Sequence, residues 1–149
     1  MGDVIAYMLT WTTYGSWLQG DERGWVRDGK IYQPNKALFK ANKESQKQDE
    51  FVLSKMHIEK IRDEIYENAK SLNQHIFALA VCKNHIHLLA NNIDKPIHII
   101  GGYYKSKTTK LLKRLGVESK VWTRGFDKRY CYDKKDLSKR IKYIENHNN

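Results

Sequence analysis

The 149-residue chain contains few cysteines and few prolines, with two of each. Cys82 and Cys131 are too few for a disulfide framework, which argues against a small disulfide-stapled fold. No apolar run approaches the roughly 18 residues needed to cross a bilayer, and the N-terminus lacks the basic and apolar pattern of a secretion signal. We therefore expect a cytoplasmic protein with reduced thiols and no membrane contact.

Acidic residues are scarce in the last third of the chain. Residues 101–149 contain 14 Lys and Arg against 5 Asp and Glu, whereas residues 1–100 contain 13 against 12. Nearly all of the net charge of +10 therefore lies in the last third. This asymmetry favours a polyanion such as nucleic acid as a partner, although a solvated basic helix has the same composition.

The apolar patterns predict a single domain over residues 1–149. The hydrophobic content of 40% is that of a folded protein. Strands are predicted over 4–11, 76–81, 85–90 and 129–132. Helices are predicted from a cap at Ser54 through Leu72, from about Pro96 to a stop at Gly116, and from Asp133 or Asp136 onward. The order strand, helix, strand, strand, helix, strand, helix is typical of an α+β ferredoxin-like (split βαβ, RRM-like) fold. It has an antiparallel sheet, helices on one face and a C-terminal helix that carries a tyrosine.

Two histidines flank one apolar residue in the predicted strand 85–90. Because side chains alternate along a strand, His85 and His87 point to one face and Ile86 to the core. Two imidazoles on a rigid strand can hold one metal ion. They can equally line a polar sheet face without binding anything.

The predicted C-terminal helix places a tyrosine and a histidine together. Tyr143 and His147 are four residues apart and so lie on the same helix face. We hypothesise that His85, His87 and His147 hold a divalent cation that binds a phosphate oxygen. The Tyr143 oxygen would then attack phosphorus, and Arg140 would supply nearby positive charge.

Two other functions fit the same residues. A structural zinc site could use Cys82, His85 and His87 with Cys131 as fourth ligand, but it leaves Tyr143 without a purpose. A basic ferredoxin-like domain can also simply bind a single-stranded nucleic acid without cutting it.

Four motifs in order closely resemble the single-tyrosine HUH transposases. They are Thr13-Tyr14-Gly15-Ser16-Trp17-Leu18 with Gly20, Asp21, Arg23 and Gly24; Asn84-His85-Ile86-His87-Leu88; Val121-Trp122 with Arg124-Gly125-Phe126; and Tyr143-Ile144-Glu145-Asn146. The loop over residues 14–17 resembles the REP-associated tyrosine transposases in particular. The loop over residues 14–24 and the small size favour the transposases over replication initiators and relaxases, which share the histidine strand.

This resemblance implies one HUH transposase/endonuclease domain over residues 1–149, which nicks and rejoins single-stranded DNA with hairpin (palindromic) elements. In the family the two strand histidines, here His85 and His87, ligate Mg²⁺ or Mn²⁺. The helix tyrosine, here Tyr143, forms a 5′-phosphotyrosine intermediate and leaves a free 3′-hydroxyl. Relatives carry Gln or Asn four residues after the tyrosine, where this chain has His147.

The DNA contacts and the assembly follow as further expectations. Aromatic residues of the N-terminal segment, Trp11, Tyr14, Trp17 and Trp25, could stack on unpaired bases or pack the loop. Candidate DNA-binding residues are Trp17, Arg23, Lys105, Lys107, Lys110 and Arg124. A homodimer with the tyrosine acting in trans, a monomer acting in cis, and a domesticated hairpin-binding relative that no longer cuts all stay open.

Overall fold

A four-stranded antiparallel sheet forms the centre of the protein. The structure, a computed structural model, describes residues 3–16, 25–27, 30–32 and 50–147. Its elements are β1 (Ala6–Thr12), β2 (Trp25–Arg27), β3 (Lys30–Tyr32), α2 (Lys55–Leu72), β4 (Ile76–Val81), β5 (His85–Asn91), α3 (Ile97–Arg114), β6 (Asp127–Cys131) and α4 (Lys134–His147). The strand order β4-β5-β1-β6 and the three helices confirm the α+β prediction. The separate β2–β3 pair was not predicted.

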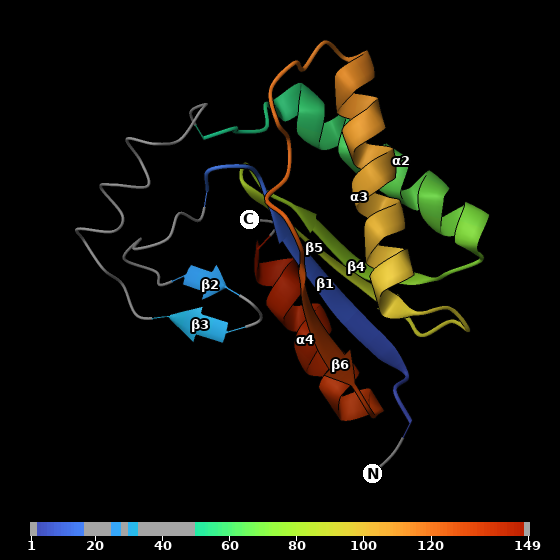
Figure 1. The fold of residues 1–149 in the computed structure, drawn as a ribbon. Helices are drawn as coiled ribbons and strands as arrows, with labels where there is room; N and C mark the ends of the chain where they lie inside the picture. The colour runs from blue at the N-terminus through green and yellow to red at the C-terminus, as the bar shows by residue number, and fades with distance from the viewer. Residues whose placement is uncertain (1–2, 17–24, 28–29, 33–49, 148–149) are drawn as a thin grey trace.

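Helices cover both faces of the sheet. Figure 1 shows α2 and α3 packed over one face and α4 against the other. Alternate β1 residues supply the two layers, because successive side chains point to opposite faces. Tyr7, Leu9 and Trp11 are buried toward α2 and α3, whereas Met8 packs with Ile144 of α4. The C-terminal tyrosine helix therefore lies on the face opposite the other two helices.

Trp11 is part of the core. Its side chain is 1% exposed and meets the ring of Trp122 edge to face, with the ring centroids 6.1 Å apart. The expectation that Trp11 could stack on DNA bases is therefore wrong. The apolar pattern of β1 places Trp11 on the core side of the strand. Burial there is favourable because it removes the large apolar area of the ring from water.

The predicted helix ends follow from local capping. Ser54 caps α2, because its hydroxyl accepts from the His57 N–H while the His57 ring accepts from the Ser54 N–H. Asp133, one of the two predicted starts of α4, accepts from the Asp136 N–H at 2.8 Å. Gly116, at φ +96°, follows the end of α3 as expected of a residue in the left-handed region.

One buried polar network ties the helices to the sheet. Gln74 donates to the Tyr7 hydroxyl and to the Asn91 carbonyl, each at 2.8 Å, and accepts from the Tyr104 hydroxyl at 2.6 Å. Burial raises the pKa of both Tyr7 and Tyr104, so both hydroxyls stay protonated. If any of these buried polar atoms lost its hydrogen-bond partner, the free energy of unfolding would fall.

Tyr104→Phe is expected to lower the free energy of unfolding by about 1–3 kcal/mol, because it leaves the buried Gln74 oxygen without its donor. Urea denaturation measures the change. The matched control is Tyr103→Phe, the neighbouring position, where the ring is partly exposed and contacts Lys107. Equal losses in the two variants would contradict the role of the network.

Among the helices in the described part of the chain, none is long and apolar enough to cross a membrane.

Candidate active site

The face of the sheet toward α4 changes from apolar to polar along β1 and β5. Met8 of β1 lies opposite Leu89 of β5, and both are buried. Two and four residues further along β1, the antiparallel register pairs Thr10 with His87 and Thr12 with His85. Ile144 of α4 packs on the apolar half and anchors the helix there. The polar half therefore faces the last turn of α4.

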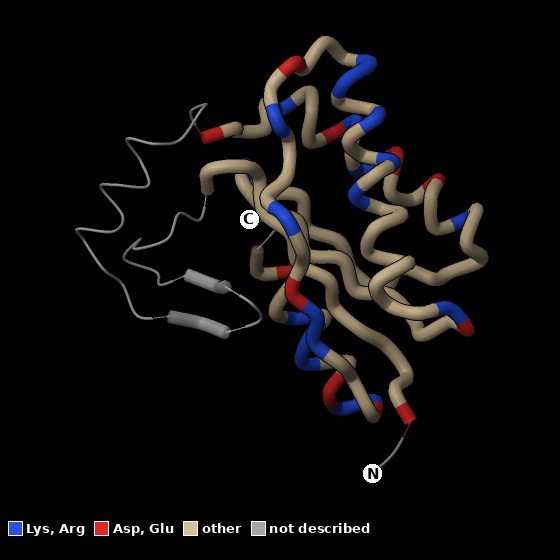
Figure 2. Tube along the Cα trace, in the orientation of Figure 1, with Lys and Arg blue, Asp and Glu red and all other residues tan. Residues whose placement is uncertain are grey.

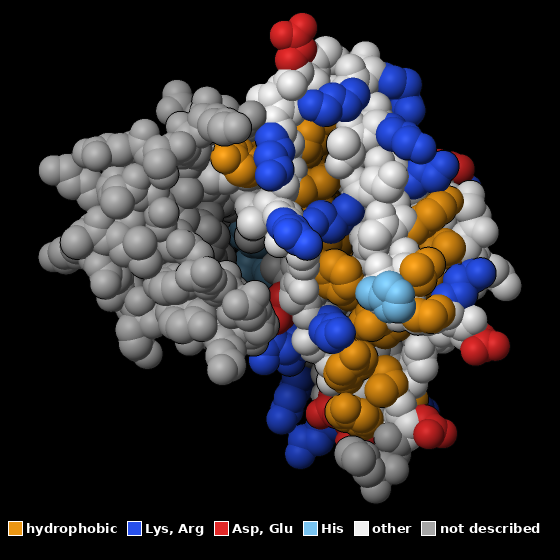
Figure 3. All heavy atoms as spheres, in the orientation of Figure 1, with side chains coloured by type: hydrophobic (Ala, Val, Ile, Leu, Met, Phe, Trp, Pro, Cys, Tyr) orange, Lys and Arg blue, Asp and Glu red, His pale blue; other side chains and the backbone are white. Residues whose placement is uncertain are grey.

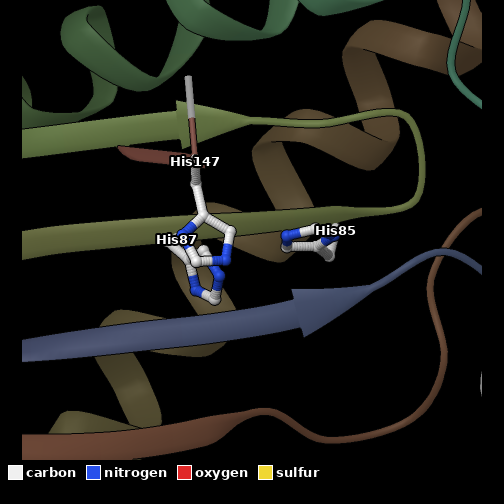
Figure 4. Close-up of side chains that lie close together, drawn as sticks. All are labelled: His85, His87 and His147. Atoms are coloured by element: carbon white, nitrogen blue, oxygen red, sulfur yellow. The ribbon is translucent and has the colours of Figure 1, made fainter. Parts of the chain in front are cut away.

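That last turn brings the tyrosine and the third histidine onto the strand histidines. The His87 ring lies 4.7 Å from the His147 ring and 5.4 Å from the Tyr143 ring, between centroids. His85 lies 4.8 Å from His87. Figure 4 shows the three histidines converging, His85 and His87 from β5 and His147 from α4. The structure thus assembles all four predicted residues within one chain.

His87 is the most enclosed of the three histidines, with 6% of its surface exposed. Burial, followed by the nearby His85, His147 and Arg140, lowers the pKa of His87 from 6.5 to about 3. A buried imidazole beside other positive groups stays neutral because desolvation and like charge both penalise its protonated form. At neutral pH His87 therefore carries a nitrogen lone pair, which is the form that binds a metal ion.

Each of the three rings is held through its Nδ1 atom. The His87 Nδ1 lies 2.7 Å from the Thr10 hydroxyl, and the His85 Nδ1 lies 2.8 Å from the side-chain oxygen of Asn84. The His147 Nδ1 lies 2.8 Å from the backbone oxygen of Tyr143. These contacts restrict the orientation of every ring.

The geometry fits one divalent cation. His85, His87 and His147 each offer a ring nitrogen, and these atoms lie within 4.8 Å of one another. Ligand atoms around one ion are about 3–4 Å apart, since metal–nitrogen distances are about 2.0–2.1 Å, so small ring rotations would close the set. Tyr143 lines the same open cavity of about 310 Å³, together with Thr10, Thr12, Ser16 and Asn84. The cavity leaves room for a ligand beside the ion.

The alternative zinc site with two cysteines is wrong. Cys131 lies opposite Ala6 at one end of β1, whereas His85 lies opposite Thr12 at the other end, about 20 Å away along the strand. Cys82 donates its thiol to the His147 carbonyl at 3.6 Å, and burial raises its pKa. Among the described residues, the clustered ligand atoms are those of His85, His87 and His147, and Cys82 is not one of them.

Positive charge lies beside the tyrosine. The Arg140 guanidinium carbon is 5.6 Å from the centroid of the Tyr143 ring, a cation–π distance. Tyr143 itself is 41% exposed, so its hydroxyl can meet a ligand in the cavity. The residue that could attack is therefore open to solvent while the metal-binding nitrogens beside it are partly enclosed.

A basic groove, defined here by its lining residues, lies at the same end of the sheet on the side of α3. It has a volume of about 340 Å³ and is lined by Lys105, Ser106, Thr109, Lys113, Lys120, Val121, Trp122, Thr123 and Arg124. Figures 2 and 3 show Lys and Arg gathered along α3 and the segment that follows it. The groove segment is tied to β1 by the hydrogen bond of 2.9 Å from the Thr123 N–H to the carbonyl of Thr12, a residue that lines the active-site cavity on the other face of the sheet.

Lys105 has a structural contact as well as a place in the groove. Its ammonium donates to the carbonyls of Thr123 and Gly125 at 2.8 and 2.7 Å, which holds the groove segment onto α3. Burial and the neighbouring Lys120 lower the pKa of Lys105 to about 8. Phe126 completes this attachment by packing on Gly101, where any Cβ would clash with the Phe126 ring.

The remaining candidate DNA-binding residues separate in space. Arg124 lines the basic groove with Lys105, but Lys107 and Lys110 of α3 do not, and Lys107 lies over the ring of Tyr103. Trp17 and Arg23 lie outside the described residues. The candidate DNA-binding residues did not include Lys113 or Lys120, and Thr10 was not singled out. Lys113 lies on the basic side of the helix that the sequence already indicates, whereas Thr10 needed the strand register.

Comparisons with known proteins give a family and a fold. A family model described as "Transposase IS200 like" matches residues 45–147. The fold is similar to that of a REP-associated tyrosine transposase bound to a REP hairpin, with a TM-score of 0.57 and 14% identity over 97% of this chain and 67% of that chain. It is also similar to a candidate transposase from Deinococcus radiodurans R1, with a TM-score of 0.57 and 14% identity over 99% of this chain and 93% of that chain. No curated protein matches the sequence.

Proposed function

This chain belongs to the IS200-like transposase family, and from that premise we propose that it is a single-tyrosine HUH strand transferase acting on single-stranded DNA. The observation that carries the proposal is the position of Tyr143 of α4 beside a cluster of three histidines. Its ring centroid lies 5.4 Å from that of the buried His87 of β5. A module that only binds DNA has no need for this placement, because a tyrosine beside a metal-binding set serves nucleophilic chemistry.

His85, His87 and His147 are the residues that would hold Mg²⁺ or Mn²⁺. When bound, the ion would neutralise charge on a phosphate oxygen and make the phosphorus easier to attack. Imidazole nitrogens suit transition metals, whereas Mg²⁺ prefers oxygen ligands. The three-imidazole set therefore favours Mn²⁺ over Mg²⁺ in this chain.

The proposed reaction conserves the phosphodiester energy. The Tyr143 oxygen loses its proton to solvent and forms a bond to phosphorus, with Arg140 stabilising the negative charge on the phenolate. The bond from phosphorus to the 3′ oxygen breaks, and that oxygen takes up a proton to become a 3′-hydroxyl. Attack by another 3′-hydroxyl on the 5′-phosphotyrosine then reverses both changes, so no nucleotide hydrolysis is needed.

We place Tyr143 in cis, attacking at the histidines of its own chain. Support comes from the anchoring of α4, whose Ile144 is fully buried against Met8 and Leu89 of the same chain. The tyrosine precedes this anchor by one residue and so has little freedom to reach a partner. A site that is complete within one chain needs no second copy for cleavage.

The substrate proposed is single-stranded DNA with a hairpin, and the similar REP-associated tyrosine transposase is itself bound to a REP hairpin. The basic groove supports this substrate, because lysine and arginine side chains bind phosphates without regard to sequence. Because Thr123 of the groove is hydrogen-bonded to Thr12 of the active-site cavity, both lie at one end of the sheet, and a DNA that wraps around this end would contact both.

Arg124→Gln is expected to weaken hairpin binding and to reduce the slope of log affinity against log salt by about one, as for the loss of one phosphate contact. Fluorescence anisotropy at several salt concentrations measures this slope. Lys60→Gln, an exposed position on α2 outside the groove, makes the same charge change as a control. A slope lowered equally by both variants would place the DNA elsewhere.

Covalent trapping tests the proposed function directly. The full chain is incubated with MnCl₂ and a labelled single-stranded DNA that carries a hairpin, then denatured in detergent. We expect a labelled protein band that survives denaturation and requires the metal. Hairpin binding without any adduct would instead support a relative that recognises DNA but no longer cuts it.

A further inference from the structure

The Nδ1 contacts of the three histidines decide which ring nitrogen can face a metal ion. A carbonyl oxygen only accepts hydrogen bonds, so the His147 Nδ1 donates to the Tyr143 carbonyl and the His85 Nδ1 donates to the side-chain oxygen of Asn84. A neutral imidazole carries one proton. A ring that donates from Nδ1 therefore has its lone pair on Nε2, and two of the rings present Nε2 as the ligand atom.

His87 differs because its partner is a hydroxyl. The Thr10 oxygen can accept from Nδ1, which leaves the lone pair on Nε2, or donate to Nδ1, which leaves a proton on Nε2 and blocks it as a ligand. The register supplies the contact: Thr10 lies directly opposite His87 on the same face of two paired strands, and the two atoms are 2.7 Å apart. His87 is also the most buried of the three rings, so water competes little for this contact.

We propose that Thr10 is a positioning residue, whose hydroxyl accepts the Nδ1 proton of His87 and thereby sets the tautomer and ring orientation in which Nε2 binds the metal. This inference rests on the metal site of the proposed function. Partners of the non-ligating nitrogen commonly tune metal-binding histidines in this way, and their loss typically costs about 10–100-fold in metal affinity.

The test compares two substitutions at one position. Thr10→Val has nearly the same shape but no hydroxyl, whereas Thr10→Ser keeps the hydroxyl. Long-range ¹H–¹⁵N NMR on the metal-free full chain reports which nitrogen of His87 is protonated. We expect Nδ1–H in the original protein and in the serine variant, and a mixture of tautomers in the valine variant.

Metal affinity is the second measurement, followed by the EPR signal of free Mn²⁺ during titration. Thr10→Val is expected to bind Mn²⁺ about 10–100-fold more weakly, and Thr10→Ser to recover the original affinity. Circular dichroism checks that each variant is folded.

Two results would overturn the role of Thr10: a proton on Nε2 of His87 in the metal-free original protein, or unchanged Mn²⁺ affinity in a folded Thr10→Val variant. Both readouts are independent of cleavage. If Mn²⁺ binds as expected and no DNA adduct forms, the proposed function fails while the role of Thr10 stands. If adducts form and Thr10→Val binds Mn²⁺ normally, the inference fails and the function stands.

Discussion

Tyr143→Phe is expected to abolish the covalent protein–DNA adduct while leaving hairpin affinity largely intact. The substitution removes only the phenolic oxygen, which is the proposed nucleophile, and keeps the ring that contacts His87 and His147. Loss of the nucleophile should lower the rate of adduct formation by at least about a thousandfold, to background. Denaturing gels measure the adduct, and anisotropy measures DNA binding on the same preparations.

Tyr132→Phe is the matched control. Tyr132 has the same 41% exposure as Tyr143 but follows β6, outside the active-site cavity, so its adduct yield should not change. An adduct of full yield in the Tyr143→Phe variant would disprove the assignment of the nucleophile.

A mixture of the Tyr143→Phe and His87→Ala proteins tests whether the tyrosine acts in cis. Each variant lacks one half of the site, so attack within one chain predicts no adduct from the mixture. Recovery of the adduct would show that one chain supplies the tyrosine to the histidines of another, and it would require a dimer.

His87→Ala is expected to remove both metal binding and cleavage. His87 is the most enclosed of the three histidines and stays neutral at working pH, so its loss opens the centre of the ligand set. We expect Mn²⁺ affinity to fall at least about a hundredfold, more than the loss of an outer partner costs. Mn²⁺ EPR follows binding, and covalent trapping follows cleavage.

His98→Ala provides the control for this variant, because His98 is exposed on α3 and lies outside the histidine cluster. Chelation of the metal should affect the original protein and the His98→Ala protein equally. Full cleavage by the His87→Ala protein would overturn the metal site.

His147→Gln tests the choice of metal in the same experiment. His147→Gln replaces an imidazole by an amide oxygen, the donor that relatives offer at this position. The substitution should weaken Mn²⁺ binding more than Mg²⁺ binding, because oxygen ligands suit Mg²⁺ and imidazole suits transition metals. Unchanged affinity for both ions in the His147→Gln variant would mean that His147 does not ligate.

Local patterns in the sequence determined the parts of the site that depend on neighbours along the chain. Alternation along β5 placed His85 and His87 on one face and Ile86 in the core, where it is fully buried. Helical spacing put Tyr143 and His147 together, and their rings lie 4.4 Å apart. The element order also predicted the α+β fold, since each element follows from its own apolar period.

Only the tertiary structure decided which distant residues meet. The β1–β5 register sets Thr10 against His87, and the buried Ile144 holds α4 on the histidine face. The same packing buries Trp11 and turns Lys105 toward backbone carbonyls. Pairing across 77 residues depends on the free energy of the whole core, and no short-range period along the chain encodes it.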